Sequence, residues 1–262
     1  MDNRKIGVMD SGIGGLTVYD QLQKVLPNEQ FIYVGDQANL PYGEKSAEQV
    51  YELTRRIADY FVDQDVKAMV IACNTATAAA YERLKDELPI PVIGVIQPGA
   101  DTALSTSKNH SIGVIATNGT VKSGDYERII KNAGDFEVIS QGCPDFVSLV
   151  ENGEAGSAHS FDLVSQQLGS FKDSDIDTMI LGCTHFPVIS AEVAAALPGV
   201  TLVDPGVATA TQVADLLTKK DALTSLKQNV ADTFYTTGNV DDFVKVADNF
   251  LESKITADHI EL

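Results

Sequence analysis

Two cysteines in this chain stand in nearly the same local sequence, 110 residues apart, at positions 73 and 183. Cys73 follows the apolar run Val70-Ile71-Ala72, Cys183 follows Ile180-Leu181-Gly182, and each precedes polar residues suited to begin a helix. A thiol at a helix N-terminus lies near unpaired N–H groups and the positive end of the helix dipole, which lowers its pKa. These two thiols are the first candidates for chemistry.

Paired thiols suit proton transfer to and from carbon. If Cys73 and Cys183 face each other across a bound molecule, one can remove a proton from a carbon while the other delivers a proton to the opposite face. A lone cysteine is most often a small buried hydrophobic residue, but the matched context of these two favours a functional pair. Cys143 has no such echo, and we interpret it as structural.

Each of the paired cysteines has a polar neighbour that can assist it. Asp10 follows the first apolar run of the chain, so we expect it at the same strand-end rim as Cys73, where a carboxylate can accept or relay the thiol proton. His185 stands two residues after Cys183 and can serve that thiol similarly. Asp10 could instead cap a helix, and His185 could lie in the core, but their places beside the cysteines favour function.

Several other segments supply hydrogen-bond donors at the same rim. The glycine-rich segment 10–15 lacks the spacing of a P-loop or a dinucleotide fingerprint, so it is weak evidence for a nucleotide. Its N–H groups and the Ser11 hydroxyl could hold a carboxylate instead, as could Asn74-Thr75 and Thr184. Pro41-Tyr42-Gly43 is predicted as a turn after the second strand.

Positioning these residues requires strands and helices, and apolar runs alternate with amphipathic segments almost from end to end. Strands are predicted at residues 5–9, 31–34, 68–72, 91–95, 112–116, 136–140, 178–181, 201–203 and 233–237. Helices are predicted between them, one opened by a Ser46 and Gln49 capping box and the last over 240–251. This alternation predicts an α/β fold with parallel sheets, buried on both faces, that bind ligands at the carboxyl ends of their strands.

The echo between the two cysteine segments predicts two similar α/β lobes, each contributing one strand-end cysteine. We place residues 1–96 and 210–262 in lobe one and residues 97–209 in lobe two, although the last segment could pack on either lobe by its pattern alone. Glu151 and Glu154 lie near a helix end, where the pattern alone indicates solvated acids.

Composition excludes several classes of partner and site. The 262 residues include 19 Lys or Arg and 37 Asp or Glu, and the resulting net charge of −18 repels nucleic acids and anionic membranes. Three cysteines without a Cys-x-x-Cys pair argue against a disulfide framework, and Cys-x-His alone supplies too few ligands for zinc. Without a signal peptide or a long apolar run, we expect a cytoplasmic protein.

Taken together, the motifs of this chain resemble those of the glutamate racemases, within the aspartate/glutamate racemase superfamily. The resemblance runs through nearly the whole chain. It is carried by residues 7–16, Gly35-Asp36 with Pro41-Tyr42-Gly43, Cys73-Asn74-Thr75-Ala76, residues 94–96 with Pro98-Gly99, Gly119-Thr120 with Ser123, and residues 181–187.

The resemblance implies two flavodoxin-like lobes related by a pseudo-twofold axis, with the active site between them. It implies interconversion of L- and D-glutamate without pyridoxal phosphate or a metal, so no cofactor is expected. D-Glutamate then supplies peptidoglycan synthesis in a bacterium. The partner implied is the small-molecule substrate, with no nucleic acid or membrane, and the family usually forms homodimers.

Residue roles carry over by position. Cys73 would take the α-proton of D-glutamate and Cys183 that of L-glutamate, assisted by Asp10 and His185 respectively. Glu151 matches an acid near the second cysteine. The positions that match substrate contacts are Asp10, Ser11, Pro41, Tyr42, Gly43, Asn74, Thr75, Thr117, Thr120, Thr184 and His185.

Some positions depart from the family pattern. Asn39 stands where Arg is common, Asp145 follows Cys143-Pro144 where an apolar residue is usual, and Asp204-Pro205 replaces a frequent Asp-Ser. Ala116-Thr117-Asn118 replaces a commoner Gly-Thr pattern. These departures concern surface contacts and dimer geometry, because none of them removes a cysteine or its assistant.

Three other functions remain open at this point. An aspartate or hydantoin racemase would use the same thiols, and comparing turnover of glutamate with that of aspartate separates these activities. A binding protein would clamp an acid between its lobes without exchanging the α-proton. A redox protein would form a disulfide between Cys73 and Cys183.

Overall fold

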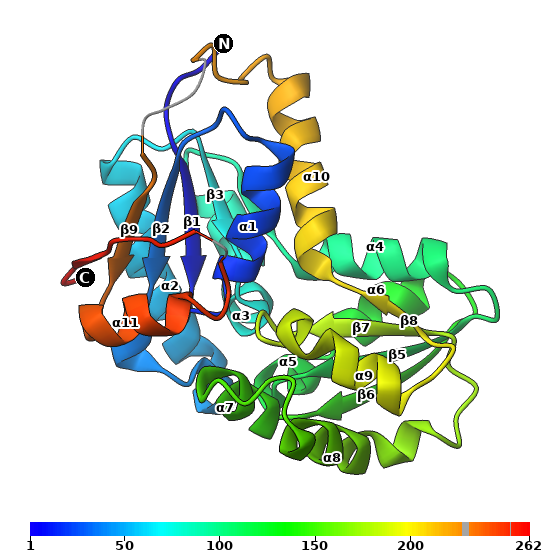
Figure 1. Cartoon of the computed structure of the whole chain (residues 1–262). Helices are drawn as coiled ribbons and strands as arrows, with labels where there is room; N and C mark the ends of the chain where they lie inside the picture. Colours follow the sequence, from blue (N-terminus) through cyan, green and yellow to red (C-terminus); the bar gives the residue numbers. More distant parts are fainter. Residues whose placement is uncertain (227–230, 252) are drawn as a thin grey trace.

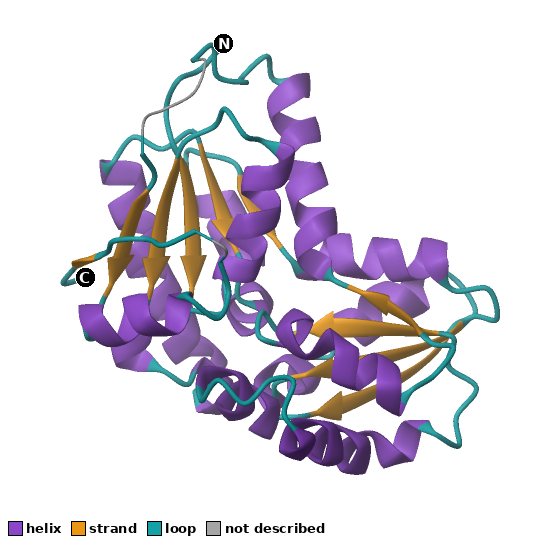
Figure 2. Ribbon diagram, viewed as in Figure 1, coloured by secondary structure: helices purple, strands orange, loops and turns teal. Residues whose placement is uncertain are grey.

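The computed structural model describes residues 1–226, 231–251 and 253–262. Two lobes, each a parallel sheet with helices on both faces, lie side by side (Figures 1 and 2). The predicted α/β class and the division into two lobes are confirmed. No helix among the described residues is both long and apolar enough to span a membrane.

Lobe one is built on a sheet in the order β10-β9-β2-β1-β3-β4, and every pairing within it is parallel. Its strands are β1 (Ile6–Asp10), β2 (Phe31–Gly35), β3 (Ala68–Ile71), β4 (Val92–Gly94), β9 (Thr233–Thr236) and β10 (Asp258–His259). The sheet therefore combines the first part of the chain with its C-terminal segment.

Lobe two is built on a second parallel sheet in the order β6-β5-β7-β8. Its strands are β5 (Ser111–Ala116), β6 (Glu137–Gly142), β7 (Thr178–Gly182) and β8 (Thr201–Val203). The first four strands of lobe one follow the same spatial order, second-first-third-fourth. In such a sheet the order in which strands are added reverses between the first and third strands, and ligands bind at the carboxyl ends of the strands there.

Helices cover both faces of each sheet (Figure 2). The α-helices are α1 (Leu16–Val25), α2 (Ala47–Asp63), α3 (Asn74–Glu87), α4 (Ile96–Thr106), α5 (Asn118–Ser123), α6 (Asp125–Ala133), α7 (Asp145–Glu151), α8 (Ala158–Gln167), α9 (Ser190–Ala196), α10 (Pro205–Lys219) and α11 (Val240–Ala247). The 3₁₀ turns among the described residues are η1 (Gln37–Asn39), η2 (Tyr42–Glu44), η3 (Leu168–Phe171) and η4 (Phe186–Ile189).

Successive residues of a strand point to opposite faces, which divides the interior of lobe one into two cores. Val8 of β1 packs with residues of α1 and α10, whereas Met9 packs with residues of α2 and α3. Both residues are fully buried. The near-continuous apolar strands of the sequence are therefore explained by burial on both faces.

Element boundaries follow the predictions closely, with two differences. Ser46 and Gln49 form the predicted capping box at the start of α2. The last helix was predicted over 240–251, but α11 ends at Ala247, and residue 252 lies outside the described residues. The short strand β10 was not predicted, because two exposed residues carry no periodic pattern.

A buried ion pair holds together the amino ends of the lobe-one strands. Lys67 Nζ lies 2.5 Å from Glu29 Oε2, and both side chains are at most 2% exposed. The ammonium group also donates to the carbonyl oxygens of Asp2 and Ala222, at 2.8 and 2.9 Å. Glu29 Oε1 accepts from Thr224 N at 2.8 Å. One node thus joins the N-terminal segment, β2, β3 and the chain after α10.

Removing Lys67 should destabilise the fold strongly, because Glu29 would be left buried without its cation. We expect Lys67→Met to lower the free energy of unfolding by roughly 3–5 kcal/mol in urea denaturation. The matched control is Lys131→Met, which removes an exposed ion pair with Glu127 and should cost less than about 1 kcal/mol. Equal costs for the two variants would contradict this account of the node.

Candidate active site

The two cysteines occupy equivalent places in the two sheets. Cys73 follows β3 and Cys183 follows β7, and each of these strands is the third of its lobe. Both thiols are buried, at 6% exposure each. Cys183 lies near enough for its charge to act on the pKa of Cys73. The lobes therefore bring together two thiols that are 110 residues apart in the sequence.

Cys73 caps α3, as the sequence predicted. Its sulfur accepts a hydrogen bond from Ala76 N at 3.4 Å and lies 3.5 Å from Ser11 Oγ. The predicted lowering of the pKa is nevertheless wrong for this thiol. Burial, reinforced by the charge of Asp10, raises the pKa of Cys73 to about 12, and the bonds from Ser11 and Ala76 offset this only in part.

Cys183 does not begin an α-helix, in contrast to the pattern that suggested one. Two residues separate it from the 3₁₀ turn η4, and α9 begins only at Ser190. The chain turns tightly at Phe186-Pro187, so the dipole of a long helix does not act on this thiol as it does on Cys73. Its nearest polar partner is a side chain instead.

That partner is His185, which connects Cys183 to Glu151. His185 Nδ1 lies 3.8 Å from Cys183 Sγ, and His185 Nε2 lies 3.1 Å from Glu151 Oε1. Burial acts to lower the pKa of His185, but the bonds to Cys183 and Glu151 outweigh it and raise the pKa to about 10. Glu151 is thus not the freely solvated acid that the pattern alone indicated, whereas Glu154 lies beside the exposed His159.

Asp10 ends β1, and its side chain reaches across to the other lobe. It is fully buried, and Asp10 Oδ2 accepts from Gly12 N at 3.1 Å. Asp10 Oδ1 accepts from Thr184 Oγ1 at 3.4 Å, and no hydrogen bond joins Asp10 to Cys73 in the described part of the chain. Burial raises the pKa of Asp10, opposed by the positive charge of His185. Asp10 thus acts on Cys73 through its charge.

The glycine-rich loop of lobe one makes close approach of the lobes possible. A Cβ added to Gly14 would lie 2.5 Å from both Thr184 Oγ1 and His185 Nδ1, a distance that atoms cannot adopt. Thr17 Oγ1 also donates to Thr184 O at 2.9 Å across the same contact. Gly14 is therefore required here for close packing of the two lobes.

A second contact between the lobes consists of three hydroxyl groups. Thr75 Oγ1 lies 2.9 Å from Thr117 Oγ1 and 3.3 Å from Thr120 Oγ1, and the last two are 3.1 Å apart. A Cβ on Gly43 would lie 3.2 Å from Thr117 Cβ, so the turn η2 closes over this cluster. Each hydroxyl can donate or accept, which suits a site that exchanges its own hydrogen bonds for those of a polar ligand.

Asp36 is a buried acid whose role is not evident from the sequence pattern. It accepts from Tyr42 Oη at 2.6 Å, from Asn39 Nδ2 at 2.9 Å and from Thr237 Oγ1 at 2.7 Å. It fixes the turn that carries Tyr42, while Pro41 beside it is exposed. The signal for Asp36 was present in the Gly35-Asp36 motif, but a motif alone does not identify its hydrogen-bond partners.

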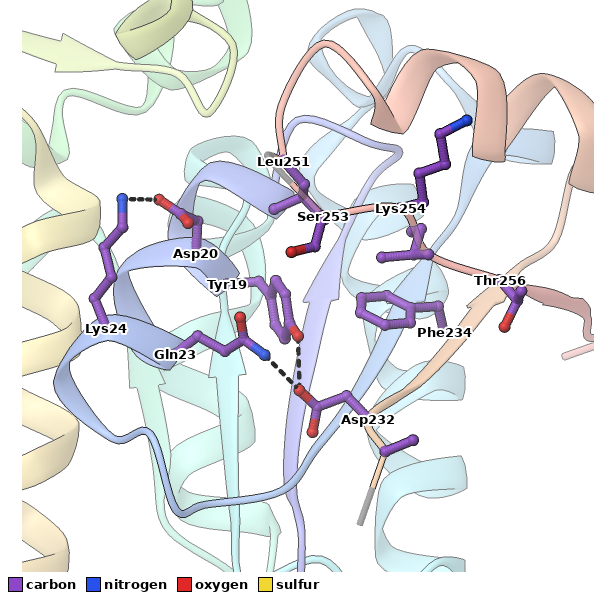
Figure 3. A pocket seen from close by; sticks show the side chains of 12 residues that line it. Tyr19, Asp20, Gln23, Lys24, Asp232, Phe234, Leu251, Ser253, Lys254 and Thr256 are labelled. Atoms are coloured by element: carbon purple, nitrogen blue, oxygen red, sulfur yellow. Dashed lines mark hydrogen bonds and ion pairs between the residues drawn. The ribbon is translucent and has the colours of Figure 1, made fainter. Parts of the chain in front are cut away.

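Features outside this region show no sign of the same chemistry. Cys143 is fully buried and contacts Gln141 Nε2 at 3.6 Å, as expected for a structural residue. A surface cavity of about 460 Å³ lies between α1, β9 and the C-terminal segment, where Asp232 accepts from Tyr19 Oη at 2.6 Å (Figure 3). Among the described residues no cluster of three or more His, Cys, Asp or Glu side chains could hold a metal ion.

Comparison with known proteins agrees with this arrangement. The family model for Asp/Glu/Hydantoin racemase matches residues 6–213. A glutamate racemase from Levilactobacillus brevis is 46% identical, covering 100% of this chain and 96% of that protein.

Two crystal structures superpose over the whole chain. A glutamate racemase isoform from Bacillus anthracis gives a TM-score of 0.95 at 37% identity, covering 100% of this chain and 99% of its own. A glutamate racemase from Francisella tularensis in complex with D-glutamate gives 0.93 at 37% identity, covering 100% and 98%. This chain therefore belongs to the Asp/Glu/Hydantoin racemase family.

Proposed function

We propose that this racemase interconverts L- and D-glutamate by moving the α-proton between two thiols. The observation that carries the proposal is the pair of strand-end cysteines, Cys73 and Cys183, at equivalent positions of two lobes that meet there. Inversion at carbon requires a base on one face and an acid on the other, and a site between two similar lobes supplies both. Relatives at 41–46% identity bear the name glutamate racemase, which favours glutamate over other amino acids.

The two thiols differ in their polar partners. On one side, His185 keeps its proton at neutral pH and can stabilise a Cys183 thiolate, while Glu151 holds the imidazole ring in place. On the other side, burial keeps Cys73 protonated. In this direction Cys183, beside His185, takes the α-proton of L-glutamate, and the protonated Cys73 donates a proton to the opposite face.

The reverse direction requires the opposite protonation states. Cys73 then removes the α-proton of D-glutamate, and the Ser11 hydroxyl and Ala76 N–H near its sulfur stabilise the thiolate. Asp10 assists by proton transfer or by its charge when substrate displaces the present contacts. While the substrate is bound, its positive ammonium group lowers the free-energy cost of holding negative charge on the Cys73 thiolate and on Asp10.

The α-proton of an amino acid is only weakly acidic, so the carbanion-like state must be stabilised by donors aimed at the α-carboxylate. The N-terminus of α3 and the hydroxyls of Thr75, Thr117, Thr120 and Thr184 are the proposed donors. Ser11, Tyr42, Gly43, Asn74 and His185 complete the proposed substrate contacts, together with Pro41. Burial of the site excludes water, which strengthens each of these interactions.

We further propose the cellular setting that the resemblance implies. The enzyme needs neither pyridoxal phosphate nor a metal, works in the cytoplasm as a homodimer, and supplies D-glutamate for peptidoglycan synthesis. Residues 1–96 with 210–262 form one lobe, and residues 97–209 form the other, which allows the lobes to open for substrate.

The first test is turnover of L-glutamate by the purified protein in D₂O, with a chelator and no added cofactor. We expect the circular dichroism signal of L-glutamate to decay to zero while proton NMR records replacement of the α-hydrogen by deuterium. L-Aspartate under the same conditions is the comparison substrate and should react much more slowly. A persistent signal with an unexchanged α-proton would exclude glutamate as the substrate.

The paired state of His185 should also appear in the pH dependence of stability. Its pKa is raised from 6.5 to about 10 in the folded protein, so between these values the folded state holds a proton that the unfolded state has lost. The stabilisation is complete below pH 6.5 and is lost as pH rises through 10. We expect the free energy of unfolding of the wild type to fall relative to His185→Gln between pH 7 and pH 10, by at most about 1.4 kcal/mol per pH unit.

The matched control for this experiment is His159→Gln, because His159 is an exposed histidine on α8. It should reproduce the wild-type dependence of unfolding free energy on pH. Parallel curves for the wild type and His185→Gln across this range would show that His185 holds no extra proton in the folded state.

A further inference from the structure

Asn74, next to Cys73, has one buried partner from the opposite lobe. It is the first residue of α3 and is 4% exposed. Tyr126 of α6, which is 3% exposed, places its hydroxyl 2.8 Å from Asn74 Oδ1. No pattern in the sequence singles out Tyr126, because it lies at an ordinary buried position of a helix.

This contact fixes the orientation of the Asn74 amide. Within the described residues the Tyr126 hydroxyl has no other hydrogen-bond partner, so its proton is donated to Asn74 Oδ1. The amide oxygen therefore faces Tyr126, and the two N–H groups of Nδ2 face the other way, where no described residue accepts them. A rotated amide would present its oxygen there, which would repel an anion.

Tyr126 is well placed to remain a fixed donor. A Cβ on Gly182, the residue before Cys183, would lie 3.2 Å from Tyr126 Cε2, so the ring packs against the strand end that carries the second thiol. Burial, together with the charges of Asp204 and Cys183, raises the phenol pKa far above neutral. The hydroxyl therefore keeps a proton to donate to Asn74 Oδ1 at any working pH.

We propose that Tyr126 is a positioning residue that holds Asn74 with its amide N–H groups toward the carboxylate of the substrate. The inference rests on the proposed function, since it assigns the ligand of Asn74 as the amino-acid carboxylate. Tyr126 itself touches no substrate. Tyr126 thus connects the Asn74 amide, beside Cys73, to the end of β7, which precedes Cys183.

The test is Tyr126→Phe, which keeps the ring and removes the hydroxyl. We expect the KM for glutamate to rise about tenfold, the effect of one mispositioned hydrogen bond, with a smaller change in kcat. The fall in kcat/KM must be equal for L- and D-glutamate, because the equilibrium constant between enantiomers is one. Tyr19→Phe is the matched control, since that hydroxyl bonds to Asp232 at the distant cavity in Figure 3, and it should leave KM unchanged.

A double-mutant cycle separates positioning from a general effect on structure. In the Asn74→Ala background, Tyr126→Phe should change KM less than about twofold, because the amide it orients is gone. Asn74→Asp keeps an acceptor for Tyr126 but lacks N–H donors, so it should raise KM with Tyr126 intact.

The inference would be overturned if Tyr126→Phe left KM unchanged, or if it changed KM by the same factor in the wild-type and Asn74→Ala backgrounds. Neither result would affect the proposed function, because the wild type would still racemise glutamate. An unchanged KM in Asn74→Asp would overturn it as well. Failure of the wild type to racemise glutamate would instead refute the proposed function.

Discussion

The site depends on how closely the glycine-rich loop of lobe one approaches the strand end of lobe two. Gly14 lies where any side chain would collide with Thr184 and His185, and Asp10 accepts a hydrogen bond from Thr184 across the same contact. Without this approach the two thiols would lie apart, each exposed to solvent at the strand end of its own lobe. With it, they lie in one buried region, where burial raises the pKa of both Cys73 and Asp10.

Similar topology does not give the two thiols similar surroundings. Cys73 has a helix N-terminus, the hydroxyl of Ser11 and the charge of Asp10, and its pKa is raised. Cys183 has His185 and, through it, Glu151. Burial and the charge of Asp10 act on Cys73, whereas a protonated His185 lies beside Cys183, so the two thiols are not equivalent in proton transfer.

The sequence predicted the features that depend on local pattern. Apolar runs located nearly all the strands, and the echo around Cys73 and Cys183 indicated two lobes with matching strand ends. It could not predict quantities set by the tertiary structure. The dipole argument for a low Cys73 pKa failed because burial outweighs it, and Tyr126 went unnoticed because its role depends on a contact 52 residues away. The bond from Thr237 to Asp36 likewise joins residues 201 positions apart, which no local pattern reveals.

The central claim is that each thiol serves one face of the substrate, and single-cysteine variants test it most directly. Each enantiomer of glutamate would be incubated in D₂O with Cys73→Ala or Cys183→Ala, and α-proton exchange followed by NMR. The account predicts that Cys73→Ala exchanges only L-glutamate, that Cys183→Ala exchanges only D-glutamate, and that neither variant racemises. A variant that racemises at the wild-type rate, or that exchanges both enantiomers equally, would contradict it.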